Sequence, residues 1–271
     1  MTRLALRTAP ADLRRDYEHL RQPERRVTVE RSRGCFIVEG RGGLRALLAS
    51  PYAVRSVLTD ERHAATVGSI VPDDVPLLVG SAAEIEALAG FAFHRGVLAS
   101  ASRMTPPPIE EVAAACDRLL VVEGVNDHEN LGALYRNAAA LGAGGVVLDP
   151  TTADPLYRRV VRVSVGNVLH VPTARASSWP DDLALVRAAG FELLALTPSP
   201  DAEPLDLVAA ATRPGDRVAL LVGAEGPGLT AAARGAADRA VCIPMEGQVD
   251  SLNVATAVAI ALYELGRISR R

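Results

Sequence analysis

Two polar, glycine-bearing junctions near the C-terminus carry residue types that can do chemistry. The first, VGAEGPGLT, places three glycines around Glu225 directly after an apolar run. Glycines let the backbone approach a ligand closely and present N–H groups to it. The second, GQVDSLN, places Ser251 and Asn253 just before an apolar, helix-like segment. Since polar junctions at strand ends are where ligands bind in open α/β sheets, the two stretches predict one shared site.

Each junction also has a purely structural explanation. The glycines can serve a tight turn, and Asp250, Ser251 or Asn253 can cap the helix that follows. Against this, VATAVAIALYEL is apolar almost all round, which is typical of a buried helix whose N-terminus faces protein or a site. The glycine junction matches neither GxGxxG nor a P-loop, which argues against dinucleotide and nucleoside triphosphate binding.

A third stretch with candidate polar residues lies further upstream, in NLGALYRNAAALG. Asn130 and Arg136 stand six residues apart near the start of an otherwise apolar helix pattern. Taken alone, Asn130 reads as a helix cap and Arg136 as a surface charge. A functional role is suggested only when Asn130 and Arg136 are considered together with the two later junctions.

Alternating strand and helix patterns surround these residues. GCFIVEG, VRSVLTDE, VPLLVG and HRGVLASAS read as strands of a small α/β domain over residues 31–105, after a helical extension at 1–30. Three consecutive prolines at 106–108 indicate a linker, 106–114. From residue 115 onward, the apolar strands DRLLVVEGV, VVLDP, GNVLHVP, FELLALTP, RVALLVG and AVCIPM alternate with helices, which predicts a mostly parallel sheet covered on both faces.

Composition narrows the class of protein further. Cys35, Cys116 and Cys242 are widely spaced and the five His residues form no HExxH, so we expect neither a disulfide framework nor a metal site. No apolar run is long enough to span a membrane and no secretion signal is evident, so we expect a cytoplasmic protein. The net charge is −3, yet residues 1–55 hold twelve Arg against six acidic residues, which indicates a polyanion partner.

In their order and spacing, NLGALYRNA, LLVGAEGPGL and CIPMEGQVDSLNVATAVAIALYE resemble the three signature motifs of the SpoU/TrmH family of RNA ribose 2′-O-methyltransferases, within the SPOUT class. The resemblance spans residues 115–267, and RGCFIVEG with LLASPYAVRSVLT is similar to the substrate-binding domain that many members carry. It implies a trefoil-knotted methyltransferase domain over 115–271 and a homodimer formed through the knot region. One departure is NDHEN, which replaces a more usual Asp-Pro approach to Asn130.

The resemblance also implies a cofactor and a set of site residues. The cofactor is S-adenosylmethionine, with no metal required. The expected cofactor-binding residues are Val222, Gly223, Gly226, Ile243, Met245, Ser251 and Leu252. The expected catalytic residues are Asn130, Arg136, Glu225, Ser251 and Asn253. Because arginine side chains do not readily give up a proton, we expect Arg136 to bind the neighbouring phosphate and to stabilise the developing alkoxide rather than to act as a free base.

The expected partner is structured RNA, with ribosomal RNA favoured over transfer RNA. The candidate RNA contacts are Arg31, Arg33, Arg41, Arg45, Arg55, Arg158, Arg159 and Arg162. Two alternatives remain open at this point: a non-catalytic RNA-binding protein that keeps the fold, and a nucleotide-dependent oxidoreductase. The missing GxGxxG counts against the oxidoreductase.

Overall fold

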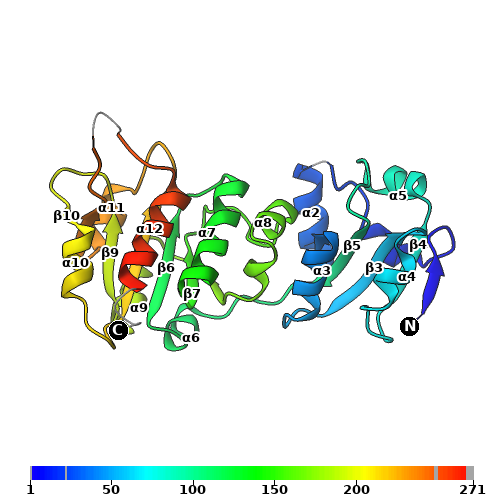
Figure 1. Cartoon of the computed structure of the whole chain (residues 1–271), viewed down its shortest axis with the longest axis horizontal. Coiled ribbons are helices and arrows are strands. Elements are labelled where there is room, and N and C mark those ends of the chain that lie inside the picture. Colours follow the sequence, from blue (N-terminus) through cyan, green and yellow to red (C-terminus); the bar gives the residue numbers. More distant parts are fainter. Residues whose placement is uncertain (1, 22, 247–249, 267–271) are drawn as a thin grey trace. The chain divides into compact units, whose positions relative to one another are not determined.

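The structure, a computed structural model, describes residues 2–21, 23–246 and 250–266. The chain divides into two compact units, residues 1–105 with 155–170 and residues 106–154 with 171–271. Each unit contains its own β-sheet (Figure 1). Segment 155–170, which the sequence reading placed in the methyltransferase domain, thus packs with the first unit.

The first unit is built on a mixed five-stranded sheet of order β1-β4-β3-β5-β2 among the described residues. Strands β1, β4 and β3 pair in parallel, whereas β5 runs antiparallel to both β3 and β2. Its elements are β1 (Arg3–Ala5), α1 (Ala11–Arg15), α2 (Pro23–Arg33), β2 (Cys35–Glu39), α3 (Gly40–Leu48), β3 (Val54–Asp60), α4 (Ala64–Gly68), β4 (Leu77–Gly80), α5 (Ala82–Ala89), β5 (Val97–Ser102), α8 (Arg158–Val163) and the 3₁₀ helix η1 (Asn167–Leu169).

The first residues of the chain are part of this unit's sheet and core. The sequence suggested a helical extension over 1–30, but β1 pairs in parallel with β4 and so adds a strand to the sheet. Tyr17 and Leu20 are buried in the same core cluster as Ile37 and Leu58. A three-residue strand carries too little apolar periodicity to be recognised from sequence, which explains the difference.

The second unit is built on a seven-stranded sheet of order β10-β12-β9-β11-β6-β7-β8 among the described residues, and every pairing is parallel. Its elements are α6 (Ile109–Ala114), β6 (Arg118–Glu123), α7 (His128–Leu141), β7 (Gly145–Leu148), β8 (Thr173–Arg175), α9 (Leu183–Ala188), β9 (Glu192–Leu196), β10 (Glu203–Pro204), α10 (Leu205–Ala211), β11 (Val218–Gly223), α11 (Ala231–Ala236), β12 (Arg239–Cys242) and α12 (Val254–Gly266). This confirms the predicted α/β class with a mostly parallel sheet.

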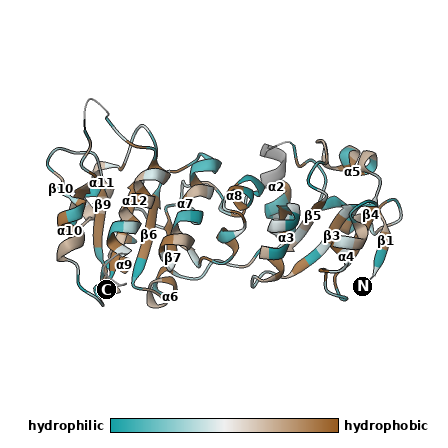
Figure 2. Ribbon diagram, in the orientation of Figure 1, coloured by the Kyte–Doolittle hydropathy of each residue, from teal (hydrophilic) through white to brown (hydrophobic). Residues whose placement is uncertain are grey.

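The apolar strands explain why this sheet forms the centre of the unit. Figure 2 shows hydrophobic colouring along β6 and β9, and residues 119–122 of β6 are all fully buried. Helix α7 starts at the capping side chain of Asp127 and ends at Gly142, whose φ of 81° favours glycine. Helix α7 packs against α12, so the segments that carry the first and third motifs lie side by side.

One predicted strand is wrong. GNVLHVP, residues 166–172, contains the 3₁₀ helix η1, and the strand β8 begins only at Thr173. Val165 and Gly166 have φ of 54° and 82°, so the chain turns sharply after α8. The side-chain amide of Asn167 donates a hydrogen bond to the backbone carbonyl oxygen of Ser164, which favours a local turn over strand pairing. The trefoil knot implied by the family resemblance stays a prediction.

Candidate active site

A cavity of about 380 Å³ opens at the carboxyl ends of β9, β11 and β12. In parallel α/β sheets this edge is where ligands bind, because the strand-to-helix loops gather there. The cavity is lined by residues from three segments, namely Leu196, Thr197, Pro198, Val222, Gly223, Ala224, Glu225, Gly226, Gly228, Leu229, Ile243, Met245, Ser251, Leu252, Asn253, Val254 and Ala257. A volume of this size falls within the range of small-molecule and cofactor sites, about 300–1,000 Å³.

The side chain of Asn253 joins all three predicted motifs. Its amide nitrogen donates to Asn130 Oδ1 at 2.9 Å and to Glu225 Oε1 at 2.6 Å. Its amide oxygen accepts from the backbone nitrogens of Ala255 at 2.9 Å and Thr256 at 3.2 Å, so it also caps the first turn of α12. Asn130 and Glu225, which lie 123 and 28 positions before Asn253 in the sequence, thus meet at one amide group.

Asn130 is held in place by the residue that starts its helix. Asp127 Oδ1 accepts from the backbone nitrogens of Glu129 at 2.9 Å and Asn130 at 2.8 Å. Two turns further along α7, Asn137 donates to the carbonyl oxygen of Ala255 at 2.7 Å and ties α7 to the start of α12. The unusual approach NDHEN therefore still builds a capped helix that presents Asn130 to Asn253.

The glycine loop after β11 depends on its glycines. A Cβ at Gly223 would lie 2.3 Å from the backbone carbon of Gly228, a distance that real Cβ atoms do not show. Gly226 and Gly228 have φ of 87° and 67°, which other residues rarely adopt. The loop folds back on itself, with Gly228 N donating to Ala224 O at 3.0 Å. Only a glycine at position 223 therefore lets the loop fold back closely against the end of β11.

Arg136 occupies a different face of α7. It is exposed, and it is not among the described residues that line the cavity. Six residues along a helix amount to about 9 Å of rise and a direction about 120° away from that of Asn130. Within one chain, the described structure therefore brings Asn130, Glu225 and Asn253 together but leaves Arg136 outside that cluster.

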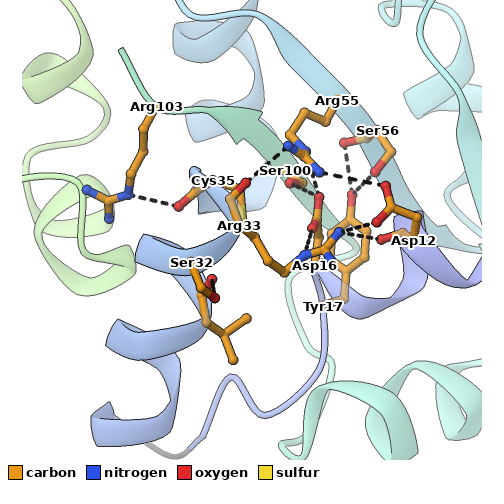
Figure 3. A network of polar contacts seen from close by, with 11 residues as sticks. Asp12, Asp16, Tyr17, Ser32, Arg33, Cys35, Arg55, Ser56, Ser100 and Arg103 are labelled. Carbon is orange, nitrogen blue, oxygen red and sulfur yellow. Dashed lines mark hydrogen bonds and ion pairs between the residues drawn. The ribbon is translucent and has the colours of Figure 1, made fainter. Parts of the chain in front are cut away.

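The candidate RNA contacts all lie in the first unit. Some of them, Arg33, Arg55 and Arg158, bind acidic side chains of the same chain. Arg33 donates through Nε to Asp16 Oδ1 at 2.6 Å, and Arg55 donates through Nε to Asp16 Oδ2 at 2.9 Å (Figure 3). Asp12 also accepts from Arg33, and this hydrogen bond is the main cause that raises the pKa of Arg33 above its usual range. Arg33 and Arg55 therefore already have carboxylate partners within the chain.

Arg158 is likewise engaged internally. It donates to Glu39 Oε2 at 2.7 Å, and its guanidinium carbon lies 4.6 Å from the centre of the Phe91 ring. Among the remaining candidates, Arg162 is half-buried. The exposed ones are Arg31, Arg41, Arg45 and Arg159. The structure thus reduces the number of candidate RNA-binding arginines whose charge faces solvent.

In the described part of the chain, no group of three or more His, Cys, Asp or Glu is arranged to hold a metal ion. No helix within those ranges is both long and apolar enough to cross a bilayer.

The sequence matches the model of the SpoU rRNA methylase family over residues 117–263, more than half of the chain. This protein belongs to that family. An uncharacterized tRNA/rRNA methyltransferase of Mycobacterium tuberculosis is 45% identical over 254 residues, a match that covers 93% of this chain and 88% of the relative. Membership of the SpoU family makes this chain an S-adenosylmethionine-dependent RNA methyltransferase and removes the oxidoreductase alternative.

Solved structures extend the similarity over both units. The crystal structure of an AdoMet-bound rRNA methyltransferase from Sinorhizobium meliloti is 25% identical, with a TM-score of 0.77 and coverage of 98% of this chain and 97% of that one. The crystal structure of an RNA 2′-O ribose methyltransferase is 28% identical, with a TM-score of 0.72 and coverage of 99% of each chain.

For a SpoU family member, the placement of the predicted cofactor residues is the main test of the site. All seven residues expected to bind the cofactor line the cavity: Val222, Gly223, Gly226, Ile243, Met245, Ser251 and Leu252. Their role in binding stays a prediction. Sequence reasoning missed the wall formed by Leu196, Thr197 and Pro198, which follows β9. The signal was available, because β9 pairs directly with β11 and parallel strands end at the same edge.

Proposed function

We propose that this protein transfers a methyl group from S-adenosylmethionine to a ribose 2′-hydroxyl of structured RNA. The observation that carries the proposal is the hydrogen-bonded meeting of Asn130, Glu225 and Asn253 at a cavity of cofactor size. The similarity over both units to an RNA 2′-O ribose methyltransferase supports the choice of the ribose oxygen. Ribosomal RNA is our preferred substrate, because the matched family model describes rRNA methylases.

The lining of the cavity suits S-adenosylmethionine in polarity and in charge. Val222, Ile243 and Leu252 give it apolar walls, and the glycines of the loop after β11 leave backbone groups accessible. Glu225 places a carboxyl group at the wall, where it can attract a positively charged ligand. When bound, S-adenosylmethionine supplies an electrophilic methyl group on a sulfonium centre.

The chain's own residues then have to orient the ribose and accommodate the proton that its hydroxyl loses. The amide group of Asn253 holds the Glu225 carboxyl and the Asn130 side chain in fixed positions, which provides a preorganised polar edge beside the cavity. Ser251, which lines the same cavity, adds a hydroxyl that can hydrogen-bond the ribose or the cofactor. Arg136 grips the adjacent phosphate and stabilises the developing alkoxide, and the phosphate accepts the proton.

Arg136 reaches the cavity, in this proposal, from a second copy of the chain. Helix α10 packs against α12, and the two expose large apolar side chains, Leu207 at 63%, Ile260 at 37% and Tyr263 at 53%. Such a surface beside a site that lacks its cationic group is suited to a homodimer in which each chain completes the site of the other.

Mixed dimers test this arrangement. Arg136→Ala and Asn253→Ala are each expected to abolish most methylation. If Arg136 acts on the partner's cavity, a mixture of the two variants regains activity, because each heterodimer contains one intact site. If Arg136 acts within its own chain, both sites of the heterodimer remain defective and no activity returns.

The chemistry itself is tested with RNA from cells that lack the gene, methyl-labelled S-adenosylmethionine and alkaline hydrolysis. A 2′-O-methyl group blocks cleavage of the neighbouring phosphodiester bond, so the label should appear in alkali-stable dinucleotides. Label in mononucleotides would mean base methylation instead. Cofactor binding without any transfer, on either ribosomal or transfer RNA, would favour the non-catalytic alternative.

A further inference from the structure

Glu123 is a buried carboxyl group that the proposed chemistry does not use. It is the last residue of β6, and only 5% of its surface is exposed. Burial of such a group is costly unless hydrogen bonds satisfy it. All the donors that the structure gives it come from two other segments of the second unit.

Most of these hydrogen bonds come from one residue, Thr230. Thr230 donates its backbone N–H to Oε2 at 2.8 Å and its hydroxyl to Oε1 at 2.8 Å. Trp179 donates its indole N–H to Oε1 at 2.6 Å. Thr230 in turn caps α11, since its hydroxyl oxygen accepts from Ala233 N at 3.1 Å.

Thr230 is the residue at which the cofactor loop ends. This loop, residues 224–229, carries Glu225 and contributes Ala224, Gly226, Gly228 and Leu229 to the cavity wall. At its other end, Gly223 pairs in register with the backbone of Glu123 in the neighbouring strand. One residue therefore holds both ends of the loop, the start through its backbone and the end through its carboxyl group.

We propose that Glu123 is a positioning residue that fixes the conformation of the cofactor loop and thereby the placement of Glu225 against Asn253. This inference rests on the proposed function insofar as the loop binds S-adenosylmethionine. Glu123 acts through Thr230, and it is not among the described residues that line the cavity.

Glu123→Gln tests the role with little change of shape. The amide has one acceptor oxygen in place of two, so one of its N–H groups must face a donor, either the backbone N–H of Thr230 or the pair formed by the Trp179 indole and the Thr230 hydroxyl. We expect the Kd for S-adenosylmethionine, measured by calorimetry on the folded full-length protein, to rise about tenfold, the effect of one lost hydrogen bond. We also expect faster amide hydrogen exchange in residues 224–229.

Asp149→Asn is the matched control. Asp149 directly follows the neighbouring strand β7 and is 2% exposed. It accepts from Gly124 N at 3.0 Å and Thr152 N at 2.7 Å, so it is a similarly buried carboxyl group at the same sheet edge. It holds the loops after β6 and β7 rather than the cofactor loop. The Asp149→Asn protein should bind S-adenosylmethionine like the wild type, with unchanged exchange in 224–229.

Thr230 provides a second pair of variants should Glu123→Gln fail to fold. Thr230→Val, which removes the hydroxyl, should reproduce a several-fold rise in Kd, whereas Thr230→Ser should restore wild-type binding. A folded Glu123→Gln protein with wild-type Kd and loop exchange overturns the proposal, as does an equal loss of binding in Asp149→Asn. A wild-type protein that binds no S-adenosylmethionine contradicts the proposed function instead, and loop exchange then still decides the role of Glu123.

Discussion

Two polar clusters, one in each unit, gather residues that are distant in sequence, and they differ in exposure. In the second unit, Asn253 links Asn130 and Glu225, and both Asn253 and Glu225 remain exposed at the cavity. In the first unit, Asp16 is fully buried and binds Arg33 and Arg55, and Ser100 also donates to it at 2.7 Å (Figure 3).

This difference in exposure distinguishes a ligand site from a purely structural cluster. The carboxyl group of Asp16 has both oxygens engaged by partners that reach it from α2, β3 and β5, so it joins those elements and leaves little capacity for a ligand. The cluster around Asn253 also joins distant segments, but it does so at the wall of a cavity with apolar surface beside it. Four predictions test this distinction, in descending order of expected effect.

The largest effect is expected for the structural cluster. Asp16→Ala leaves the charges of Arg33 and Arg55 without their buried partner, which should lower the free energy of unfolding by about 3–5 kcal/mol. Denaturant unfolding measures this, with the exposed Asp74→Ala as a control that should change stability by less than about 0.5 kcal/mol. The folded Asp16→Ala protein should keep its affinity for S-adenosylmethionine, because the cavity lies in the other unit; a selective loss of cofactor binding would contradict the distinction.

Asn253 should show the opposite balance of activity and stability. Both Asn253→Ala and Asn253→Asp remove the N–H donor to Asn130 and Glu225, and a misplaced polar group can slow methylation about 100-fold. Asn253→Asp keeps an oxygen that can cap α12 but places a second carboxyl group beside Glu225, whereas the alanine variant loses the cap and with it about 1 kcal/mol of stability. Single-turnover methylation and unfolding measurements separate the two roles, and an Asn253→Asp enzyme with a wild-type rate would refute the catalytic one.

The exposed arginines of the first unit provide the third test. Replacing Arg41 and Arg45 by Ala should reduce the slope of log K against log salt for RNA binding by about 1 per residue, because each phosphate contact releases counterions. Arg213→Ala removes an exposed charge from the second unit and is the control. An unchanged slope in the Arg41/Arg45 variant would mean that these two residues of α3 do not contact RNA phosphates.

The smallest effect concerns pH. Burial alone would raise the pKa of Asp149, but hydrogen bonds from Gly124, Thr151 and Thr152 outweigh it, and the pKa is lowered overall. A carboxyl group with a lowered folded-state pKa stabilises the fold above its unfolded value, near pH 4, and this contribution is lost as the pH falls through the folded value. The stability difference between wild type and Asp149→Asn, about 1 kcal/mol at neutral pH, should therefore shrink in acid; a constant difference would contradict this account.

Much of the fold and of the cavity could be predicted from sequence because both depend on local patterns. The apolar strands β6, β9 and β11 are continuous runs, and each motif stands directly after a strand or at a helix start. The parallel arrangement then requires that the strand ends meet at one edge, which is why the residues expected around the cofactor lie together.

What could not be predicted depends on partners far away in sequence. Arg33 and Arg55 are the same residue type as Arg41 and Arg45, and their distant carboxylate partners, Asp12 and the buried Asp16, cannot be recognised from sequence. Glu123 resembles any acidic residue at the end of a strand until Thr230, 107 residues later, is seen to bind it. Segment 155–170 was assigned by its place between two motifs, whereas its packing with β2 and α3 decides its unit.

The central claim, that three distant segments form one cofactor site, is tested most directly by a crystal structure of the protein with S-adenosylhomocysteine. The account predicts that the ligand occupies the cavity at the carboxyl ends of β9, β11 and β12, in contact with Gly223, Ile243 and Leu252. A ligand bound elsewhere on the chain, with this cavity left vacant at saturating concentration, would contradict it.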